Sequence, residues 1–227
     1  MERTPPVEPR FARIAASIGD PTRARMLATL LGGDRRPAGD IARMTGVNPS
    51  TASEHLAKLV HEGLVVVEPR GRHRYYRVAD ADVARALEAL SLVAERREAD
   101  AKWRREPYQS LKHARTCYRH LAGELGVELL RSLIERGRLV ASQHGYEMTR
   151  AGRSWLQSIG IDPASPLRGE RYAYPCLDWS ERRDHMAGRL ATALLDHFTT
   201  RRWLVRVRDT RALRVTAEGR RQLSTVL

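Results

Sequence analysis

The stretch NPSTASEHLAKLVHEGLVVVEPRGRHRYYRV, residues 48–78, decides the fold of the N-terminal third of the chain. It begins with Asn48, a residue type that caps helices, and Pro49, which suits the first helical position. Apolar residues then recur at helical spacing as far as Gly63, a residue type common just after the C-terminus of a helix. The pattern predicts an amphipathic helix that ends at Gly63, followed at once by β-rich sequence.

Shorter helical segments precede this helix. The segment FARIAASIG ends at Gly19, and Asp20 with Pro21 then begins PTRARMLATLL. A break at GGDRRP leads to AGDIARMTG, which closes at Gly46. Two short helices joined by TGVN are typical of a helix-turn-helix, whose second helix suits the major groove of DNA.

The predicted recognition helix has two faces. Its core stripe consists of Ala52, Leu56, Leu59 and Val60, which are spaced to lie on one side. The remaining side chains are polar and mostly short, so the backbone can come close to phosphates. The residues expected at the DNA from this helix are Asn48, Ser50, Thr51, Ser53, Glu54, His55 and Lys58.

A hairpin is predicted after the recognition helix. Two β-rich runs, 64–68 and 73–78, flank the turn sequence Pro69-Arg70-Gly71-Arg72. Its tip carries Arg70, Arg72 and Arg74, with Tyr75 beside them. These four residues are expected to contact the phosphate backbone or the minor groove, as a wing does. An ordinary solvated hairpin is the alternative, because turns are often charged.

The order of these elements closely resembles the ArsR family of winged-helix repressors. The resemblance covers about residues 8–92 and rests on IGDPTRARMLATLL and on DIARMTGVNPSTASEHLAKLVHEGLVVVEPRGRHRYYRV, which stand in register. It implies a homodimeric repressor on a palindromic operator. It also implies that the first helix and the helix after the wing, DADVARALEALSLVAERR, form the dimer interface.

The sequence departs from the metal sites of that family. Founding members carry a cysteine cluster where this chain reads RRPAGDIARM, which contains no cysteine. Other members bind metal through Asp and His on the last helix, where this chain has Asp80, Asp82 and Glu88 but no histidine. Any effector is therefore expected to act elsewhere in the chain.

The composition favours a polyanionic partner. The net charge is +13 and the isoelectric point is about 10.7, which is typical of nucleic-acid-binding proteins. An Arg-rich proteome is the alternative, because lysine occurs only at Lys58, Lys102 and Lys112. No long apolar run or secretory signal is visible. With two cysteines and no disulfide framework, we expect a cytoplasmic protein that does not contact membranes.

The C-terminal half contains an internal repeat. HLAGELGVELL at His120 aligns with HMAGRLATALL at His185, and later Thr149 aligns with Thr216. Each unit is expected to be a long amphipathic helix, a hairpin and a Thr-capped helix, and the proline-rich GIDPASPLRGERYAYPC between the units is expected to be a loop. We therefore predict an α+β chain, mainly α with small hairpins. Its predicted parts are a winged helix-turn-helix over 1–92, a charged linker over 93–116 and a duplicated domain over 117–227, with repeats at about 117–160 and 176–227.

A set of cysteines and histidines begins these repeats. The candidate effector or metal ligands are His113, Cys117, His120, Cys176 and His185. Cys117 and His120 would share a helix face, and four such ligands suit a soft or borderline divalent metal. A cysteine redox switch, plain packing of buried side chains, and a haem or aromatic effector near Trp155, Trp179 and Tyr174 remain open.

These features favour a DNA-binding transcriptional repressor that acts as a homodimer on double-stranded DNA. Its C-terminal domain would sense an effector or stabilise the dimer. One alternative is a basic architectural protein that coats DNA without an operator. An enzyme with a DNA-binding N-terminal half is another alternative, but no phosphate-binding glycine loop, metallohydrolase motif or nucleophile elbow is present, so we do not expect an enzyme.

Overall fold

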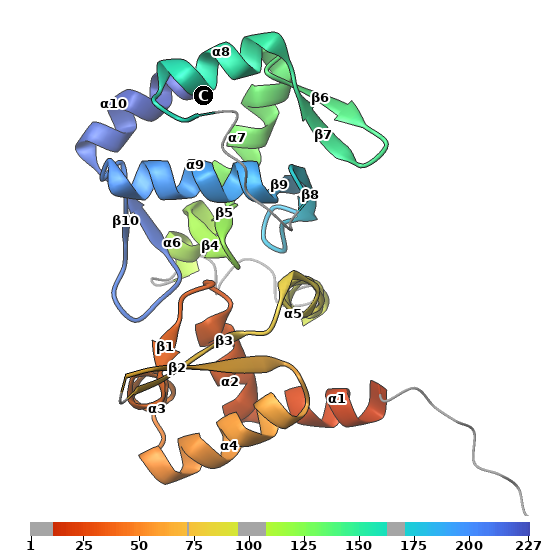
Figure 1. The fold of residues 1–227 in the computed structure, drawn as a ribbon, viewed down its shortest axis with the longest axis vertical. Coiled ribbons are helices and arrows are strands. Elements are labelled where there is room, and N and C mark those ends of the chain that lie inside the picture. The colour runs from red at the N-terminus through yellow and green to blue at the C-terminus, as the bar shows by residue number, and fades with distance from the viewer. Residues whose placement is uncertain (1–10, 72, 95–107, 163–170) are drawn as a thin grey trace, which may run out of the picture. The chain divides into compact units, whose positions relative to one another are not determined.

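The computed structural model describes residues 11–71, 73–94, 108–162 and 171–227. The chain forms two compact units, Met1–Val83 and Ala84–Leu227 (Figure 1). The predicted DNA contact Arg72 and most of the predicted linker lie outside the described residues.

The first unit is a winged helix-turn-helix. Its helices are α1 (Phe11–Ile18), α2 (Pro21–Leu30), α3 (Ala38–Thr45) and α4 (Pro49–His61), and its strands are β1 (Arg36–Pro37), β2 (Val65–Arg70) and β3 (His73–Val78). The strands form an antiparallel sheet in the order β1-β3-β2. Helix α5 (Ala81–Ala94) begins in this unit and continues into the second.

The predicted helix ends of the first unit are confirmed. Asp20 accepts a hydrogen bond from Arg23 N at 2.8 Å, and Asn48 accepts one from Thr51 N at 2.8 Å. Both acceptors satisfy an amide that has no partner within its own helix. Gly46 ends α3 in the left-handed conformation with φ 72°.

Arg23 explains the DPTR start of α2. Its guanidinium is buried and donates to Ser17 O at 2.6 Å and to Ala16 O at 3.0 Å. These carbonyls lie in the last turn of α1, where they lack helical partners. Arg23 therefore ties the C-terminus of α1 to the N-terminus of α2.

Strand β2 of the wing extends two residues farther toward the turn than the sequence predicts. Pro69 and Arg70 continue β2, and Arg70 pairs with His73. Because β2 is an edge strand, it tolerates a proline. The two-residue strand β1 was not predicted, since it is too short to show a period.

The second unit contains the remaining elements. They are α6 (Tyr108–His113), β4 (Arg115–Cys117), β5 (His120–Ala122), α7 (Glu124–Glu135), β6 (Leu139–Ser142), β7 (Gly145–Met148), α8 (Arg150–Ser158), β8 (Tyr174–Leu177), β9 (Asp184–Ala187), α9 (Arg189–Thr200), β10 (Leu204–Arg206), β11 (Leu213–Val215) and α10 (Ala217–Val226). From β4 onward, the order hairpin, helix, hairpin, helix occurs twice.

Two predictions for the second unit are wrong. Cys117 and His120 do not share a helix, because they lie on opposite strands of a tight hairpin whose turn includes Tyr118 with φ 54°. The helix begins only at Glu124, after Gly123. The end of the predicted proline-rich loop is strand β8, in which Pro175 is tolerated because both strands of a two-stranded sheet are edges.

The predicted threonine caps are confirmed. Thr149 accepts a hydrogen bond from Gly152 N at 3.0 Å, and Thr216 accepts one from Gly219 N at 2.9 Å. The two threonines are the positions that align in the sequence. Each Thr–Gly pair begins the helix that follows a hairpin, α8 and α10 respectively.

Helices α7 and α9 supply much of the core of the second unit. Leu133, Leu194 and Phe198 are almost completely inaccessible to solvent. Helix α7 packs against β9, and α9 packs against β5, so each helix contacts the hairpin that precedes the other helix. Within the described part of the chain, no helix combines the length and apolar character needed to cross a bilayer.

Gly123 lies at the junction between the β4–β5 hairpin and α7, where a substitution can test the packing. Its φ is 81°, and a Cβ there would lie 2.5 Å from Lys112 O. At Gly137 the φ is 62°, but a Cβ would meet nothing within 4 Å. We expect Gly137→Ala to cost about 1–2 kcal/mol of unfolding free energy, from the backbone conformation alone. Gly123→Ala should cost more, because the clash adds to that strain. Denaturant unfolding measures both, and equal losses would contradict the close approach.

Candidate nucleic-acid interface and Cys–His cluster

Helix α4 presents a polar face to solvent. Ala52, Leu56 and Leu59 are fully buried, as predicted, whereas Val60 is half-buried. On the other side, Ser50, Ser53, Glu54 and Lys58 are exposed, and Thr51 is half-buried. The buried stripe fixes the rotation of the helix, so the exposed face keeps a constant orientation within the unit.

Short hydrogen bonds order the beginning of that face. Asn48 Oδ1 accepts from Ser50 Oγ at 2.7 Å, and Ser53 Oγ donates to Pro49 O at 2.9 Å. Both hydroxyl protons are directed toward the protein. The serine oxygens therefore offer lone pairs to solvent, which suits the amino groups of adenine or cytosine in a major groove.

His55 lies closer to the protein than the other predicted contacts. Its Nδ1 is 3.3 Å from Arg23 Nη1 and 3.8 Å from Asp20 Oδ1. These residues form the junction between α1 and α2. His55 thus connects α4 to that junction, and its ring is half-buried.

The wing carries exposed arginines on strands that a carboxylate holds together. Arg70 and Arg74 are exposed, and Tyr75 is half-buried. Glu68 Oε2 accepts from Arg35 Nε at 2.5 Å, and its Oε1 accepts from Arg77 Nε at 2.8 Å. These hydrogen bonds lower the pKa of Glu68 to about 2. Glu68 therefore stays ionised at neutral pH and holds β2 to its neighbours.

A hollow separates α4 from the wing. Its volume is ≈ 580 Å³. Ser53 and His61 line it from α4, and Arg74 and Tyr76 line it from β3. A polar helix beside a cationic hairpin is the arrangement with which winged helices bind a groove and its flanking phosphates.

In the second unit, four predicted ligands meet in the interior. The ligand atoms of Cys117, His120, Cys176 and His185 all lie within 4.8 Å of one another. Each side chain is at most 6% exposed. The remaining candidate, His113, is exposed and lies 3.2 Å from Glu124, outside this Cys–His cluster.

Strand register explains the convergence. Cys117 pairs directly with His120 across β4 and β5, and Cys176 pairs with His185 across β8 and β9. Each hairpin thus supplies one thiol and one imidazole. The two imidazoles approach through Nε2, at 3.1 Å.

Asp178 organises this region, although the sequence analysis did not identify it. Its Oδ1 accepts from Arg115 Nη2 at 2.6 Å, and its Oδ2 accepts from Gly123 N at 2.7 Å. Both side chains of the Arg115–Asp178 pair are inaccessible to solvent. The position of Asp178 between Cys176 and His185 was the available signal, because carboxylates commonly orient histidine ligands.

Asp178 also faces the cluster. Its Oδ2 lies 3.1 Å from His185 Nδ1, although the pair is not aligned as a hydrogen bond. Burial opposes ionisation of Asp178, but His185 and Arg115 outweigh it and hold the pKa of the carboxyl well below its usual range. Burial lowers the pKa of His185, but Asp178 and Cys117 outweigh burial and raise this pKa to about 9. The carboxylate thus favours a proton on Nδ1, and Nε2 is the nitrogen that faces the cluster.

Both thiols are buried, and Cys117 is held in its protonated form. The hydrogen bond with Cys176, together with burial, raises the pKa of Cys117 to about 12. Reactive and redox-sensing cysteines have lowered pKa values and solvent access. The free Cys117 thiol has neither property.

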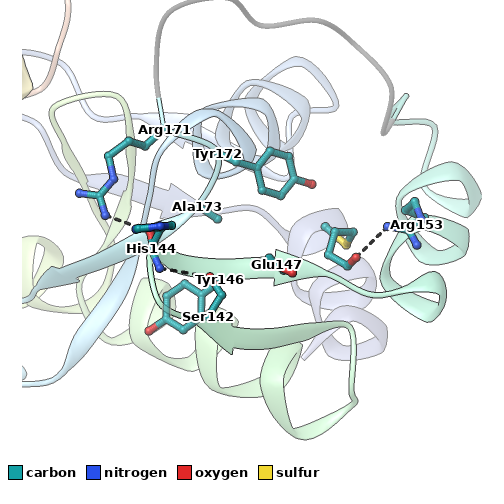
Figure 2. A pocket seen from close by; sticks show the side chains of 9 residues that line it. Ser142, His144, Tyr146, Glu147, Arg153, Arg171, Tyr172 and Ala173 are labelled. Carbon is teal, nitrogen blue, oxygen red and sulfur yellow. Dashed lines mark hydrogen bonds between the residues drawn. The ribbon is translucent and has the colours of Figure 1, made fainter.

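A separate surface pocket of ≈ 560 Å³ lies beside the β6–β7 hairpin. Figure 2 shows Tyr146 and Tyr172 in this pocket. Arg171 donates a hydrogen bond to the backbone carbonyl of His144, and Arg153 donates one to the backbone carbonyl of Met148. The aromatic residues singled out from the sequence lie elsewhere. Arginine guanidinium groups stack on each of them, at 4.4–4.5 Å from the ring centre: Arg138 on Trp155, Arg115 on Trp179 and Arg171 on Tyr174.

Comparison with known proteins agrees with the first unit and extends beyond it. A helix-turn-helix domain family matches residues 18–68. The HTH-type transcriptional regulator YdfF of Bacillus subtilis is 40% identical over 215 residues, which cover 94% of this chain and 95% of YdfF. The HTH-type transcriptional regulator CmtR of Mycobacterium bovis is 42% identical over 83 residues, which cover 37% of this chain and 70% of CmtR.

Among solved structures, the homodimeric winged helix-turn-helix domain of Mb0332 from Mycobacterium bovis is 36% identical, with a TM-score of 0.36, over 38% of this chain and 79% of that one. From its relationship to YdfF and CmtR and its winged helix-turn-helix, the chain belongs to the ArsR family of HTH-type, DNA-binding transcriptional regulators.

Proposed function

We propose that this chain is a homodimeric repressor that binds a palindromic operator. The observation that supports this most strongly is the exposed polar face of α4 beside the cationic wing. In this proposal, Ser50, Ser53, Glu54 and Lys58 contact base edges, and Arg70 and Arg74 contact phosphates or the minor groove. Asn48 and His55 hold α4 in place. The net charge of +13 favours the approach to DNA.

Exposed apolar residues support the dimer. Helix α1 has the apolar sequence FARIAASI, yet only Ser17 is buried, and Phe11 is 71% exposed. On α5, Leu90 and Val93 are 49% and 55% exposed. These two helices are the ones that the family resemblance assigns to the dimer interface, and burying their apolar surface would stabilise a dimer.

The second unit is proposed to sense an effector or to stabilise the dimer through α5. Within that unit, Glu88 of α5 is buried and forms an ion pair with the guanidinium of Arg211. The backbone carbonyl of Arg211 accepts a hydrogen bond from Thr116 N at 2.9 Å. Thr116 adjoins Cys117, so contacts connect the Cys–His cluster to α5. An effector would act by binding one arrangement of α5 better than another, with a typical coupling of about 1–3 kcal/mol. Equal operator affinity with and without the effector would contradict a sensing role.

The two hairpin–helix–hairpin–helix segments are proposed to be a duplication. The aligned positions His120 and His185, and Thr149 and Thr216, occupy corresponding places in the two segments. On this proposal, residues 1–92 bind DNA and dimerise, and residues 117–227 form the regulatory module.

The phosphate contact is tested by Arg74→Ala. We expect binding to weaken on operator and random DNA alike, and the slope of log affinity against log salt to fall by about 1, because one phosphate contact is lost. The matched control is Arg208→Ala, which removes a cation that is 88% exposed at its side chain in the second unit. Fluorescence anisotropy over a salt series measures both variants. An unchanged slope for Arg74→Ala would exclude a phosphate contact by Arg74.

Base reading is tested by Lys58→Ala. A side chain that contacts a base edge discriminates between base pairs by about 1–3 kcal/mol. We therefore expect Lys58→Ala to relax sequence preference at one position of each half-site, with a smaller effect on random DNA. Selection from a randomised duplex library measures this preference. Equal losses on specific and random DNA would leave Lys58 a phosphate contact, and an absence of any preferred site in the unsubstituted protein would favour the architectural alternative.

The dimer is tested by Leu90→Glu. A buried unpaired charge at an interface is costly, so this variant should become monomeric at concentrations at which the unsubstituted protein is a dimer. Val140→Glu is the matched control, because Val140 on β6 is 48% exposed against 49% for Leu90. Light scattering after size-exclusion chromatography gives the masses. A dimer that survives Leu90→Glu would place the interface elsewhere.

A further inference from the structure

The Cys–His cluster has the composition of a closed metal site. It consists of two thiols and two imidazoles, which are all buried in the second unit. Zinc in structural sites is bound tetrahedrally by such sulfur and nitrogen sets. We propose that Cys117, His120, Cys176 and His185 together bind one Zn²⁺-class ion.

The separation of the imidazoles fits such an ion. Zinc–nitrogen bonds of about 2.0–2.1 Å place two nitrogens of a tetrahedron about 3.3 Å apart. The two Nε2 atoms lie 3.1 Å apart. The four ligand atoms all lie within 4.8 Å of one another. Two sulfurs bound to zinc at about 2.3 Å would lie about 3.8 Å apart, so zinc binding requires the ligand atoms to move together by at most about 1 Å.

Charge balance favours the same ion. A divalent cation bound to two thiolates and two neutral imidazoles has no net charge, so the complex can stay buried at low cost. The nearby ions are already paired, Asp178 with Arg115 and Glu88 with Arg211. A monovalent cation bound to the same four ligands, or an anion in place of the metal ion, would leave an uncompensated charge in the interior.

Asp178 supplies the outer support that metal-bound histidines commonly have. It lies 3.1 Å from His185 Nδ1, on the side of the ring that faces away from the cluster. Such a carboxylate orients the ring and raises its basicity. Arg115 and Gly123 N hold the carboxylate in turn.

The four ligands also determine the role of the ion. Each hairpin contributes one Cys–His pair, so the ion cross-links β4–β5 to β8–β9. Four protein ligands leave no position for water or substrate, which is typical of structural or sensing sites rather than catalytic ones. The site differs from the family's known metal positions because it lies wholly in the second unit.

Two other arrangements of the same residues make different predictions. A Cys117–Cys176 disulfide would lower the mass by two hydrogens and prevent thiolate binding of metal. Simple packing would leave the residues without an ion under all conditions. Both arrangements are distinguished from a metal site by one set of measurements on the full chain.

The test is metal content and spectroscopy of the full-length protein, purified under reducing conditions from medium that contains Zn²⁺. Elemental analysis should find about one zinc per chain, and free thiols should be absent until the zinc is removed. Titration of the metal-free protein with Co²⁺ should give intense visible bands of a tetrahedral ion and a thiolate charge-transfer band, saturating at one equivalent. Added Zn²⁺ should displace the Co²⁺ and raise the melting temperature.

Variants assign the ligands. Cys117→Ser and Cys176→Ser should each abolish stoichiometric zinc binding. Asp178→Asn should weaken zinc binding by at least about 10–100-fold, because it removes the carboxylate that supports His185 and also leaves Arg115 without its charge partner. His113→Ala, which changes a histidine outside the cluster, should keep full zinc content. Because the cysteine variants can misfold, the Co²⁺ spectrum of the unsubstituted protein decides independently. A disulfide in the purified protein, no Co²⁺–thiolate band, or full zinc content in the cysteine variants would overturn the proposal. None of these outcomes depends on DNA binding.

Discussion

The buried ion pair between Arg115 and Asp178 is the interaction on which the second unit depends. Removing one partner from such a pair costs about 3–5 kcal/mol, because the other charge is left buried without compensation. The chain therefore keeps the first strand of one hairpin, the turn of the other hairpin and the start of α7 in one arrangement. The Cys–His cluster lies between these elements and depends on the same constraint.

The first unit depends on a different network. Arg23 binds the carbonyls at the end of α1 and lies beside His55 of α4, while Asp20 caps α2. The recognition helix is thus fixed at its core face, at its N-cap and along one flank. This explains how a helix with short polar side chains can present them in a constant orientation. Helix α5 begins in the first unit, after the wing, and carries Glu88 into the second unit.

Local signals predicted the first unit well. Caps, prolines at the first helical position and glycines at helix ends act over three or four residues, so a single sequence displays them. The core stripe of α4 followed from periodicity, and the wing followed from run length and turn chemistry. The extent of the wing did not, because the edge position that allows Pro69 in a strand depends on tertiary structure.

The second unit shows where such reasoning stops. The segment CYRHLAGELG continues an apolar helical pattern, and the hairpin before Gly123 is too short to give a period of two. Spacing along the chain also gives no reason to place Cys176 beside His185, yet strand register places them opposite each other around a longer turn. Asp178 and Arg115 were missed because their meeting depends on the packing of two hairpins far apart in the sequence.

In this proposal the two hairpins form one thiolate–imidazole metal site. The decisive experiment is X-ray absorption spectroscopy at the zinc edge of the loaded, full-length protein. We expect a first shell of two sulfurs at about 2.3 Å and two nitrogens at about 2.0 Å, with the outer scattering of imidazole rings. A shell of oxygen and nitrogen alone, without sulfur, would contradict it.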